Sequence, residues 1–287
     1  MKSVGVVTTS RADYGIYRPV LRILDGADRI DLRLFVSGMH LSPSFGTTVE
    51  EIEKDGYTIQ ERIPTLLASD DPSSIAKTMG LATMGFSSAF GHWEPDILMI
   101  LGDRYEMYPA AAAALPFTIP VAHIHGGELT QGAIDDSLRH SMTKLSHVHF
   151  ATTEEYARRI RQMGEEPWRV HVSGAPSLDN IRNIDLLSPS EFESEFDVAL
   201  SDEFVLSTYH PVTLSHENTE WQVEQLFESL ESLQMQVLFT MSNADTGGQV
   251  VNEMIQDFAH SRDWVYFVGH LGTRGYFSAM HHATVMV

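Results

Sequence analysis

The sequence contains no cysteine among its 287 residues. This absence excludes disulfide bonds, thiolate metal ligands and a cysteine nucleophile, and it fits a reducing compartment. Long hydrophobic runs are also absent, because no apolar stretch approaches the ~20 residues that span a bilayer. The N-terminal stretch MKSVGVVTTS is too short and too mixed for a signal peptide. We therefore expect a cytoplasmic protein without a membrane partner.

Positive charge is scarce in this chain. Its 19 lysines and arginines face 39 aspartates and glutamates, which gives a formal net charge of −20. Such a protein repels nucleic acids and anionic membranes outside local basic patches. Nucleic acid is therefore not expected as a partner, and an anionic substrate must be held by a few placed arginines.

The order of the apolar runs predicts the fold. Short β-rich runs alternate with helix-like stretches through residues 3–172, which is typical of a doubly wound parallel sheet. Residues 180–202 interrupt this alternation with a Ser-Pro pair and a series of acids, and strand-like runs then resume. We predict an α/β protein of two domains, residues 1–182 and 183–287.

Polar side chains gather where two of the predicted strands end. The segment HIHGGELTQGAIDDSLRH, residues 123–140, follows an apolar run, and the strand at residues 96–101 is followed by Gly102, Asp103 and Arg104. Ligands of open α/β sheets bind beyond the carboxyl ends of the strands. Carboxylates, imidazoles and a guanidinium at that position suit proton transfer on an anionic substrate.

A set of motifs along the chain carries a family resemblance. The motifs are TTSRADYG at 8–15, GDR at 102–104, the segment 123–140, GAP at 174–176, HPVT at 210–213 and NAD at 243–245. In this order they resemble the hydrolysing UDP-N-acetylglucosamine 2-epimerases, which supply N-acetylmannosamine for sialic-acid synthesis. The resemblance implies two Rossmann-like domains of the GT-B-like kind, with a UDP-sugar between them. It also implies a homodimer or homotetramer.

The resemblance further implies a reaction that needs no redox cofactor. UDP leaves by anti-elimination to give a 2-acetamidoglucal, and water then adds to release the C2-inverted sugar. A positioned base must remove the weakly acidic C2 proton, and a second carboxyl group must act on the opposite side. Asp103, Glu128 and Asp135 are the candidate acids, because neighbouring acids can have their pKa values pushed apart. The family pattern favours Asp135 over Asp136, although either acid also stabilises the first turn of a helix.

His125 departs from the family pattern. Some relatives carry glutamate at this position, where this chain reads HIHGG. Two alternatives stay open: His125 takes the catalytic role itself, because histidine titrates near neutrality, or Glu128 reaches into the same space. A histidine that merely hydrogen-bonds a neighbouring loop is the structural alternative. His210, before Pro211, resembles the family's histidine in the second domain and completes the predicted catalytic set.

Five residues are expected to bind the substrate. They are Arg11, Arg104, His40, Asn243 and Asp245. Arg11 follows the first strand, where arginines and helix N-termini meet phosphates, and the resemblance implies that it contacts the UDP pyrophosphate. The usual dinucleotide fingerprint G-x-G-x-x-G is missing there. For Asn243 and Asp245, a helix N-cap and a turn are an equally good interpretation.

Other function classes compete with this interpretation. His123 and His125, two positions apart, could join Asp103 as ligands in a metal-dependent hydrolase, although no H-E-x-x-H pattern supports this. A non-catalytic sugar-nucleotide-binding module and a glycosyltransferase of the same architecture are further alternatives. Within the epimerase class, a UDP-2,4-diacetamido-6-deoxy sugar of the legionaminic-acid pathway is the alternative substrate.

Relatives continue beyond the last residues of this sequence into a Gly-Asn-Ser-Ser loop and further helices. The resemblance therefore implies an incomplete second domain. From this we expect weak or no turnover unless a partner supplies the missing surface.

Overall fold

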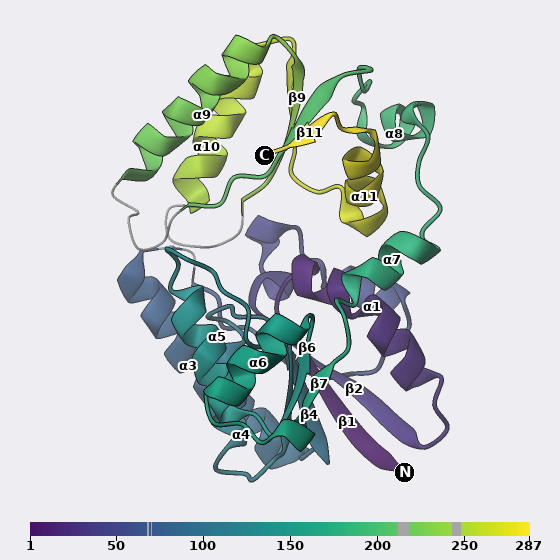
Figure 1. Cartoon of the computed structure of the whole chain (residues 1–287), viewed down its shortest axis with the longest axis vertical. Helices are drawn as coiled ribbons and strands as arrows, with labels where there is room; N and C mark the ends of the chain where they lie inside the picture. Colours follow the sequence, from purple (N-terminus) through teal and green to yellow (C-terminus); the bar gives the residue numbers. More distant parts are fainter. Residues whose placement is uncertain (68, 70, 212–217, 243–247) are drawn as a thin grey trace. The chain divides into compact units, whose positions relative to one another are not determined.

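The computed structural model describes residues 1–67, 69, 71–211, 218–242 and 248–287. The chain forms two compact units, Met1–Arg182 and Asn183–Val287. Each unit contains a sheet of parallel strands flanked by helices (Figure 1), which confirms the predicted α/β class. None of the described helices combines the length and the apolarity that a bilayer crossing requires.

Unit 1 is built on a seven-stranded sheet of order β3-β2-β1-β4-β5-β6-β7. Its strands are β1 (Lys2–Thr8), β2 (Ile30–Ser37), β3 (Ile59–Ile63), β4 (Ile97–Leu101), β5 (Val121–Ile124), β6 (Val148–Ala151) and β7 (Val170–Val172). All the described pairings are parallel. The chain runs outward from β1 to β3 and then resumes on the other side of β1 with β4. This reversal creates a topological switch point, where open α/β sheets bind ligands.

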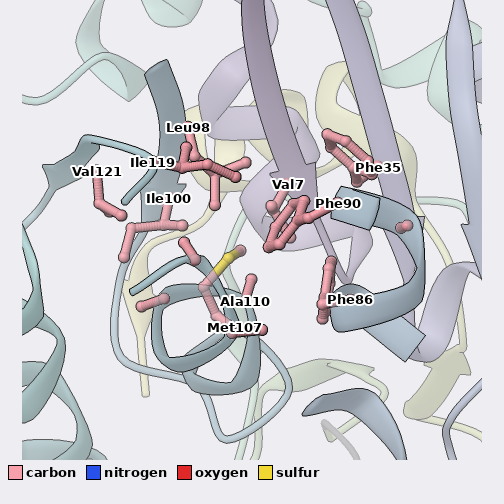
Figure 2. Packing of buried hydrophobic residues seen from close by; sticks show 14 of the residues in the cluster. Val7, Phe35, Phe86, Phe90, Leu98, Ile100, Met107, Ala110, Ile119 and Val121 are labelled. Atoms are coloured by element: carbon pink, nitrogen blue, oxygen red, sulfur yellow. The ribbon is translucent and has the colours of Figure 1, made fainter. Parts of the chain in front are cut away.

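Helices cover both faces of this sheet. They are α1 (Arg11–Asp25), α2 (Val49–Lys54), α3 (Pro72–His92), α4 (Tyr108–Ala114), α5 (Asp135–Leu145), α6 (Glu154–Gln162) and α7 (Ser177–Asn183), with 3-10 turns at η1 (Gly38–Leu41), η2 (Pro43–Phe45) and η3 (Pro167–Arg169). On one face, Phe86 and Phe90 of α3 gather with Phe35 around Val7 of β1 (Figure 2). On the other face, α1 and α2 pack over the same strands. Burial on both faces explains why the strands read as continuous apolar runs.

Helix α1 begins at Arg11, three residues after the end of β1. Ser10 caps it and accepts the backbone N–H of Asp13, and the Asp13 carboxylate accepts the N–H of Ser10 in return. Pro19 lies inside the helix and has no N–H for the carbonyl of Gly15. The Asn180 side chain donates to that carbonyl over 2.6 Å, so α7 supplies the bond that Pro19 cannot make.

A polar clasp joins the first residues of β1 to Asp96, which directly precedes β4. The carboxylate of Asp96 accepts hydrogen bonds from the Ser3 amide and hydroxyl, over 2.8 and 2.9 Å, and pairs with Lys2 at 2.7 Å. The Asp96 amide donates back to the Ser3 hydroxyl over 2.9 Å. The hydrogen bond from Lys2, followed by those from Ser3, lowers the pKa of Asp96. The clasp thus fixes the register between two strands that are far apart in sequence.

Unit 2 repeats the architecture on a smaller scale, with strand order β10-β9-β8-β11. Its elements are α8 (Pro189–Phe196), β8 (Phe204–Ser207), α9 (Thr219–Leu233), β9 (Gln236–Thr240), α10 (Gly248–His260), β10 (Val265–Val268), α11 (Gly272–His282) and β11 (Val285–Met286). Helices α9 and α10 pack on one face of the sheet, and α8 and α11 pack on the other. The segment 180–202, predicted as a break, therefore contains a helix. Ser188 and Glu191 form a capping box at its start.

Candidate active site

The polar residues predicted at the strand ends lie together beyond the carboxyl ends of β4, β5 and β6. These strands are neighbours in the sheet and run parallel. Asp103 follows β4, and His125 and Glu128 lie in the loop after β5. Thr152 follows β6, and Arg139 reaches the cluster from α5. The sheet thus assembles one polar cluster from distant parts of the sequence.

Arg139 holds two carboxylates in this cluster. Its guanidinium forms an ion pair with Asp103, and its Nη1 lies 3.7 Å from Oε2 of Glu128. Its Nη2 donates to the Thr130 hydroxyl over 3.0 Å, and that hydroxyl donates to Asp103 Oδ2 over 3.2 Å. Only 7% of the Arg139 side chain is exposed, so water screens these charges weakly. Sequence reasoning missed this role, because nothing in the local sequence connects Arg139 with Asp103 or Glu128.

His125 and Glu128 form a hydrogen-bonded pair. Nδ1 of His125 lies 2.9 Å from Oε1 of Glu128, which also accepts the Thr152 hydroxyl over 2.9 Å. Burial alone would raise the pKa of Glu128, but the hydrogen bond and charge of His125, with Thr152 and Arg139, lower it overall. Glu128 is therefore ionised at neutral pH. His125 and Glu128, which the sequence left as alternatives, are therefore hydrogen-bonded to each other.

His123 lies behind this pair and is fully buried. Its Nε2 lies 2.8 Å from the Gly102 carbonyl, and its Nδ1 lies 3.3 Å from the Thr143 hydroxyl. Because a carbonyl only accepts, Nε2 carries the proton and Nδ1 is left unprotonated beside the Thr143 hydroxyl, which itself donates to the Arg139 carbonyl over 3.0 Å. Its hydrogen bond supports the turn that carries Asp103.

The metal-dependent hydrolase alternative does not fit this geometry. The nitrogens of His123 face Gly102 and Thr143, whereas Nδ1 of His125 faces Glu128. Strand β5 ends at Ile124 and His125 adopts φ +65°, so the strand alternation that would place both imidazoles on one side stops between them. No group of three or more His, Cys, Asp or Glu side chains in the described ranges could hold a metal ion.

The burial of His123 predicts a loss of stability in acid. Burial, the largest cause, lowers the pKa of His123 to about 3, against about 6.5 for an exposed histidine. Below pH 6.5, His123 is therefore protonated in the unfolded chain but stays neutral in the folded chain. Between about pH 6 and 4 this one group should remove about 1.4 kcal/mol of unfolding free energy per pH unit.

Urea unfolding of the wild type and His123→Gln across this pH range measures the effect. Glutamine keeps a donor for the Gly102 carbonyl but does not titrate, so its stability should fall less steeply with acid. The buried His40 and His149, whose pKa values burial also lowers, remain in both proteins. Equal slopes for the two proteins would contradict the assignment.

The carboxyl end of β1 forms a second polar cluster, around Asp13. This buried carboxylate accepts the amides of Thr9 and Ser10 over 3.0 and 2.9 Å, together with the hydroxyl of Thr8. The amides of Thr9 and Ser10, which directly precede α1, are therefore occupied from within the protein. Arg11 extends from the first turn of this helix and is partly buried, and that burial lowers its pKa against the opposing charge of Glu51. Any phosphate at this helix start would rely on Arg11 rather than on these amides.

His40 lies beneath that cluster. Its Nε2 is 2.9 Å from the Thr8 hydroxyl, its Nδ1 is 2.7 Å from the Thr48 hydroxyl, and the side chain has no solvent exposure. Both ring nitrogens of His40 are thus engaged within the protein, and its contact with the substrate stays a prediction. Its two hydrogen bonds tie the end of β1 to the start of α2.

Arg104 is engaged by a partner that sequence reasoning missed. Its Nε and Nη2 each lie 3.1 Å from a carboxylate oxygen of Glu106, whose side chain is fully buried. Such two-point pairing fixes the guanidinium plane. Its neighbour Asp103 pairs instead with Arg139 of α5.

The two acids at the start of α5 are Asp135 and Asp136. Asp136 accepts the Thr130 amide over 3.0 Å and lies 3.8 Å from Nε2 of His140. Asp135 is the first residue of the helix. The role of Asp135 in catalysis stays a prediction.

In unit 2, the predicted residues follow β8 and β9. Nδ1 of His210 lies 3.5 Å from the Ser242 hydroxyl, and the Ser242 amide donates to the Asn252 side chain over 2.8 Å. Asn243 and Asp245 lie outside the described residues. His210 thus lies at the carboxyl end of the smaller sheet, as the alternation of strands and loops predicts.

Known proteins resemble this chain in both sequence and fold. The sequence profile of the family described as UDP-N-acetylglucosamine 2-epimerase matches residues 22–287. The GDP/UDP-N,N'-diacetylbacillosamine 2-epimerase (hydrolyzing) of Campylobacter jejuni is 39% identical, over 100% of this chain and 75% of that protein. The UDP-N,N'-diacetylbacillosamine 2-epimerase (hydrolyzing) of Legionella pneumophila is 36% identical, over 100% and 76% of the two chains.

A solved structure shows the same fold at low sequence identity. The crystal structure of UDP-GlcNAc 2-epimerase from Neisseria meningitidis bound to UDP-GlcNAc has a TM-score of 0.79 and 17% identity, and the match covers 100% of this chain and 77% of that one. Together, the family profile and the full-length matches to hydrolysing 2-epimerases show that this chain belongs to the UDP-N-acetylglucosamine 2-epimerase family of enzymes.

Proposed function

We propose that this chain removes the nucleotide diphosphate from a UDP-linked 2-acetamido sugar and releases the free sugar with C2 inverted. The observation that carries this proposal is the pair of carboxylates, Asp103 and Glu128, held by the buried Arg139. Inversion at C2 requires proton removal on one face and proton delivery on the other, so two acid-base groups are needed. A cation between them stabilises both carboxylates in a weakly screened site.

The proposed reaction is redox-neutral. Elimination breaks the C2–H bond and the bond from C1 to the diphosphate oxygen, and it forms the C1=C2 double bond. Water then adds its hydroxyl to C1, and a proton is delivered to C2 from the opposite face. No redox cofactor is needed, and Arg11 is the proposed diphosphate contact. A homodimer or homotetramer in the cytoplasm is part of the same proposal.

For the sugar, we propose a UDP-linked 2,4-diacetamido-6-deoxy sugar of the N,N'-diacetylbacillosamine type. Support comes from the Campylobacter and Legionella enzymes, which are named for this substrate and match over the whole of this chain at 39% and 36% identity. UDP-N-acetylglucosamine is the second candidate, because the description of the matching family names it.

The reaction is tested by incubating the chain with each sugar nucleotide in D₂O, with a chelator and without any acceptor sugar. We expect UDP and a free sugar with inverted C2 that carries one deuterium at C2, both detected by NMR. Retained C2 configuration without deuterium would indicate simple hydrolysis. Consumption only with an acceptor would indicate a glycosyltransferase, and binding without consumption of either compound would leave a binding module; each of these results overturns the proposal.

A further inference from the structure

The loop after β5 has an unusual backbone at its first residue. His125 adopts φ +65°, a left-handed conformation that is uncommon for residues other than glycine. Its amide donates to the Phe150 carbonyl over 3.1 Å, which anchors this conformation to β6. The turn sends Nδ1 toward Glu128, three residues further on. The fold thus maintains an unfavourable backbone conformation where His125 meets Glu128.

The two nitrogens of His125 have different surroundings. Nδ1 donates to Oε1 of Glu128 over 2.9 Å. Nε2 is buried from solvent and has no hydrogen-bond partner among the described residues. The hydrogen bond that the structure shows for the His125 ring is therefore the one to Glu128.

The two oxygens of Glu128 also differ. Oε1 receives the hydrogen bonds from His125 and Thr152, both at 2.9 Å. Oε2 faces Nη1 of Arg139 at 3.7 Å, which is longer than a hydrogen bond. About a fifth of the side chain, 21%, remains exposed. Among the described residues, Oε2 thus receives no hydrogen bond, and the carboxylate is oriented through its other oxygen.

We propose that Glu128, rather than His125, takes the C2 proton, and that His125 and Thr152 are positioning residues that orient the Glu128 carboxylate. This inference rests on the proposed function. In the step, the C2–H bond breaks and its proton passes to Oε2. The electron pair of that bond forms the C1=C2 double bond, and the pair of the C1–O bond leaves with the diphosphate oxygen. The proton on Glu128 is later released to water.

The charged groups around Glu128 come from several elements. His125 lies on the same loop, Arg139 approaches from α5 and pairs with Asp103 after β4, and Arg159 of α6 donates to the Gly127 carbonyl beside it. Because His125 donates a hydrogen bond to the carboxylate, its removal should raise the pKa of Glu128. The acid limb of the kcat/KM profile reports this group in the free enzyme.

Two variants separate the roles of Glu128 and His125. Glu128→Gln should lower kcat by about 1,000-fold or more, at the level of removing an essential general base. His125→Asn keeps the left-handed backbone but removes the ring; it should lower kcat by about 10- to 100-fold, leave KM within about threefold, and move the acid limb to higher pH. Thr152→Val should shift the same limb in the same direction by a smaller amount.

The exposed Glu154→Gln on α6 and His92→Asn on α3 are matched controls for charge loss and ring loss. Urea midpoints of all variants, measured at pH 7.5, show which are folded. If His125→Asn removes both turnover and the acid limb while Glu128→Gln retains turnover, the assignment is overturned. Release of UDP by Glu128→Gln with accumulation of the 2-acetamidoglucal would also overturn it, because Glu128 would then act only in the water addition.

These failures differ from failure of the proposed function. A wild type that releases no UDP from either sugar nucleotide would overturn both proposals. A wild type that forms the C2-deuterated product, together with unchanged kcat and acid limb in His125→Asn and Thr152→Val, would overturn only the positioning roles.

Discussion

Arg139→Met should lower the unfolding free energy by about 3–5 kcal/mol and remove most turnover. The guanidinium is almost fully buried between Asp103 and Glu128, so its loss leaves two weakly solvated carboxylates close together. Breaking one partner out of a buried ion pair typically costs this much, because the remaining charge stays in the interior. Losing a positioned electrostatic donor also lowers kcat by about 100- to 1,000-fold.

Two comparisons test the physical reason for this effect. In Arg139→Met/Asp103→Asn, one of the stranded charges is removed, so part of the lost stability should return while turnover stays low. The exposed Arg158→Met on α6 should change stability by only about 0.5 kcal/mol. Urea unfolding at pH 7.5 and UDP release measure both quantities. A double variant that is less stable than Arg139→Met would contradict charge burial as the cause.

Gly127→Ala should lower the unfolding free energy by about 2–5 kcal/mol, through a conformational and a steric term. Gly127 has φ +78°, and a Cβ there would lie 2.5 Å from the Tyr156 carbonyl oxygen and 2.8 Å from Cγ1 of Ile160. Tyr156 and Ile160 both belong to α6, which packs in the core through these residues. Either the helix or the loop must move, and the loop carries Glu128. A displacement near 1 Å should lower kcat by about 100-fold.

Gly56→Ala is the control for the conformational term. Gly56 has φ +83°, but a Cβ there meets no atom within 4 Å. This variant should lose only the cost of the left-handed backbone, about 1–2 kcal/mol, and keep wild-type turnover. Equal losses of stability in Gly127→Ala and Gly56→Ala would show that the contact with α6 is unimportant.

The sequence predicts most of the larger sheet because parallel strands are buried on both faces and read as apolar runs. This criterion does not detect strand β3 (IQERI) or helix α2 (VEEIEK). Both segments are short and rich in charged residues, and they gain their structure from packing. Helix α8 is missed because the Ser188-Pro189 pair at its start looks like a break. Proline at the first position of a helix, with Ser188 and Glu191 as a capping box, marks a start instead.

The candidate site shows the same division. Its strand-end location follows from local sequence, so Asp103, His125 and Glu128 could be nominated. Arg139 could not, because its partners are set by the register of β4, β5 and α5 rather than by spacing along one helix. His40 could be nominated as a substrate contact, but its two ring nitrogens lie within hydrogen-bond distance of threonine hydroxyls from two separate segments. Such partners become visible only after the chain has folded.

The clasp between Ser3 and Asp96 has a consequence for the order of folding. Strand β1 lies in the middle of the sheet, but its partner β4 begins only at Ile97. During synthesis at about 5–20 residues per second, β1 therefore waits for several seconds with one edge unpaired. Pairings of such long sequence separation also slow folding in general. The N-terminal strand is thus the first strand made, but the larger sheet cannot enclose it until the chain has been synthesised past β4.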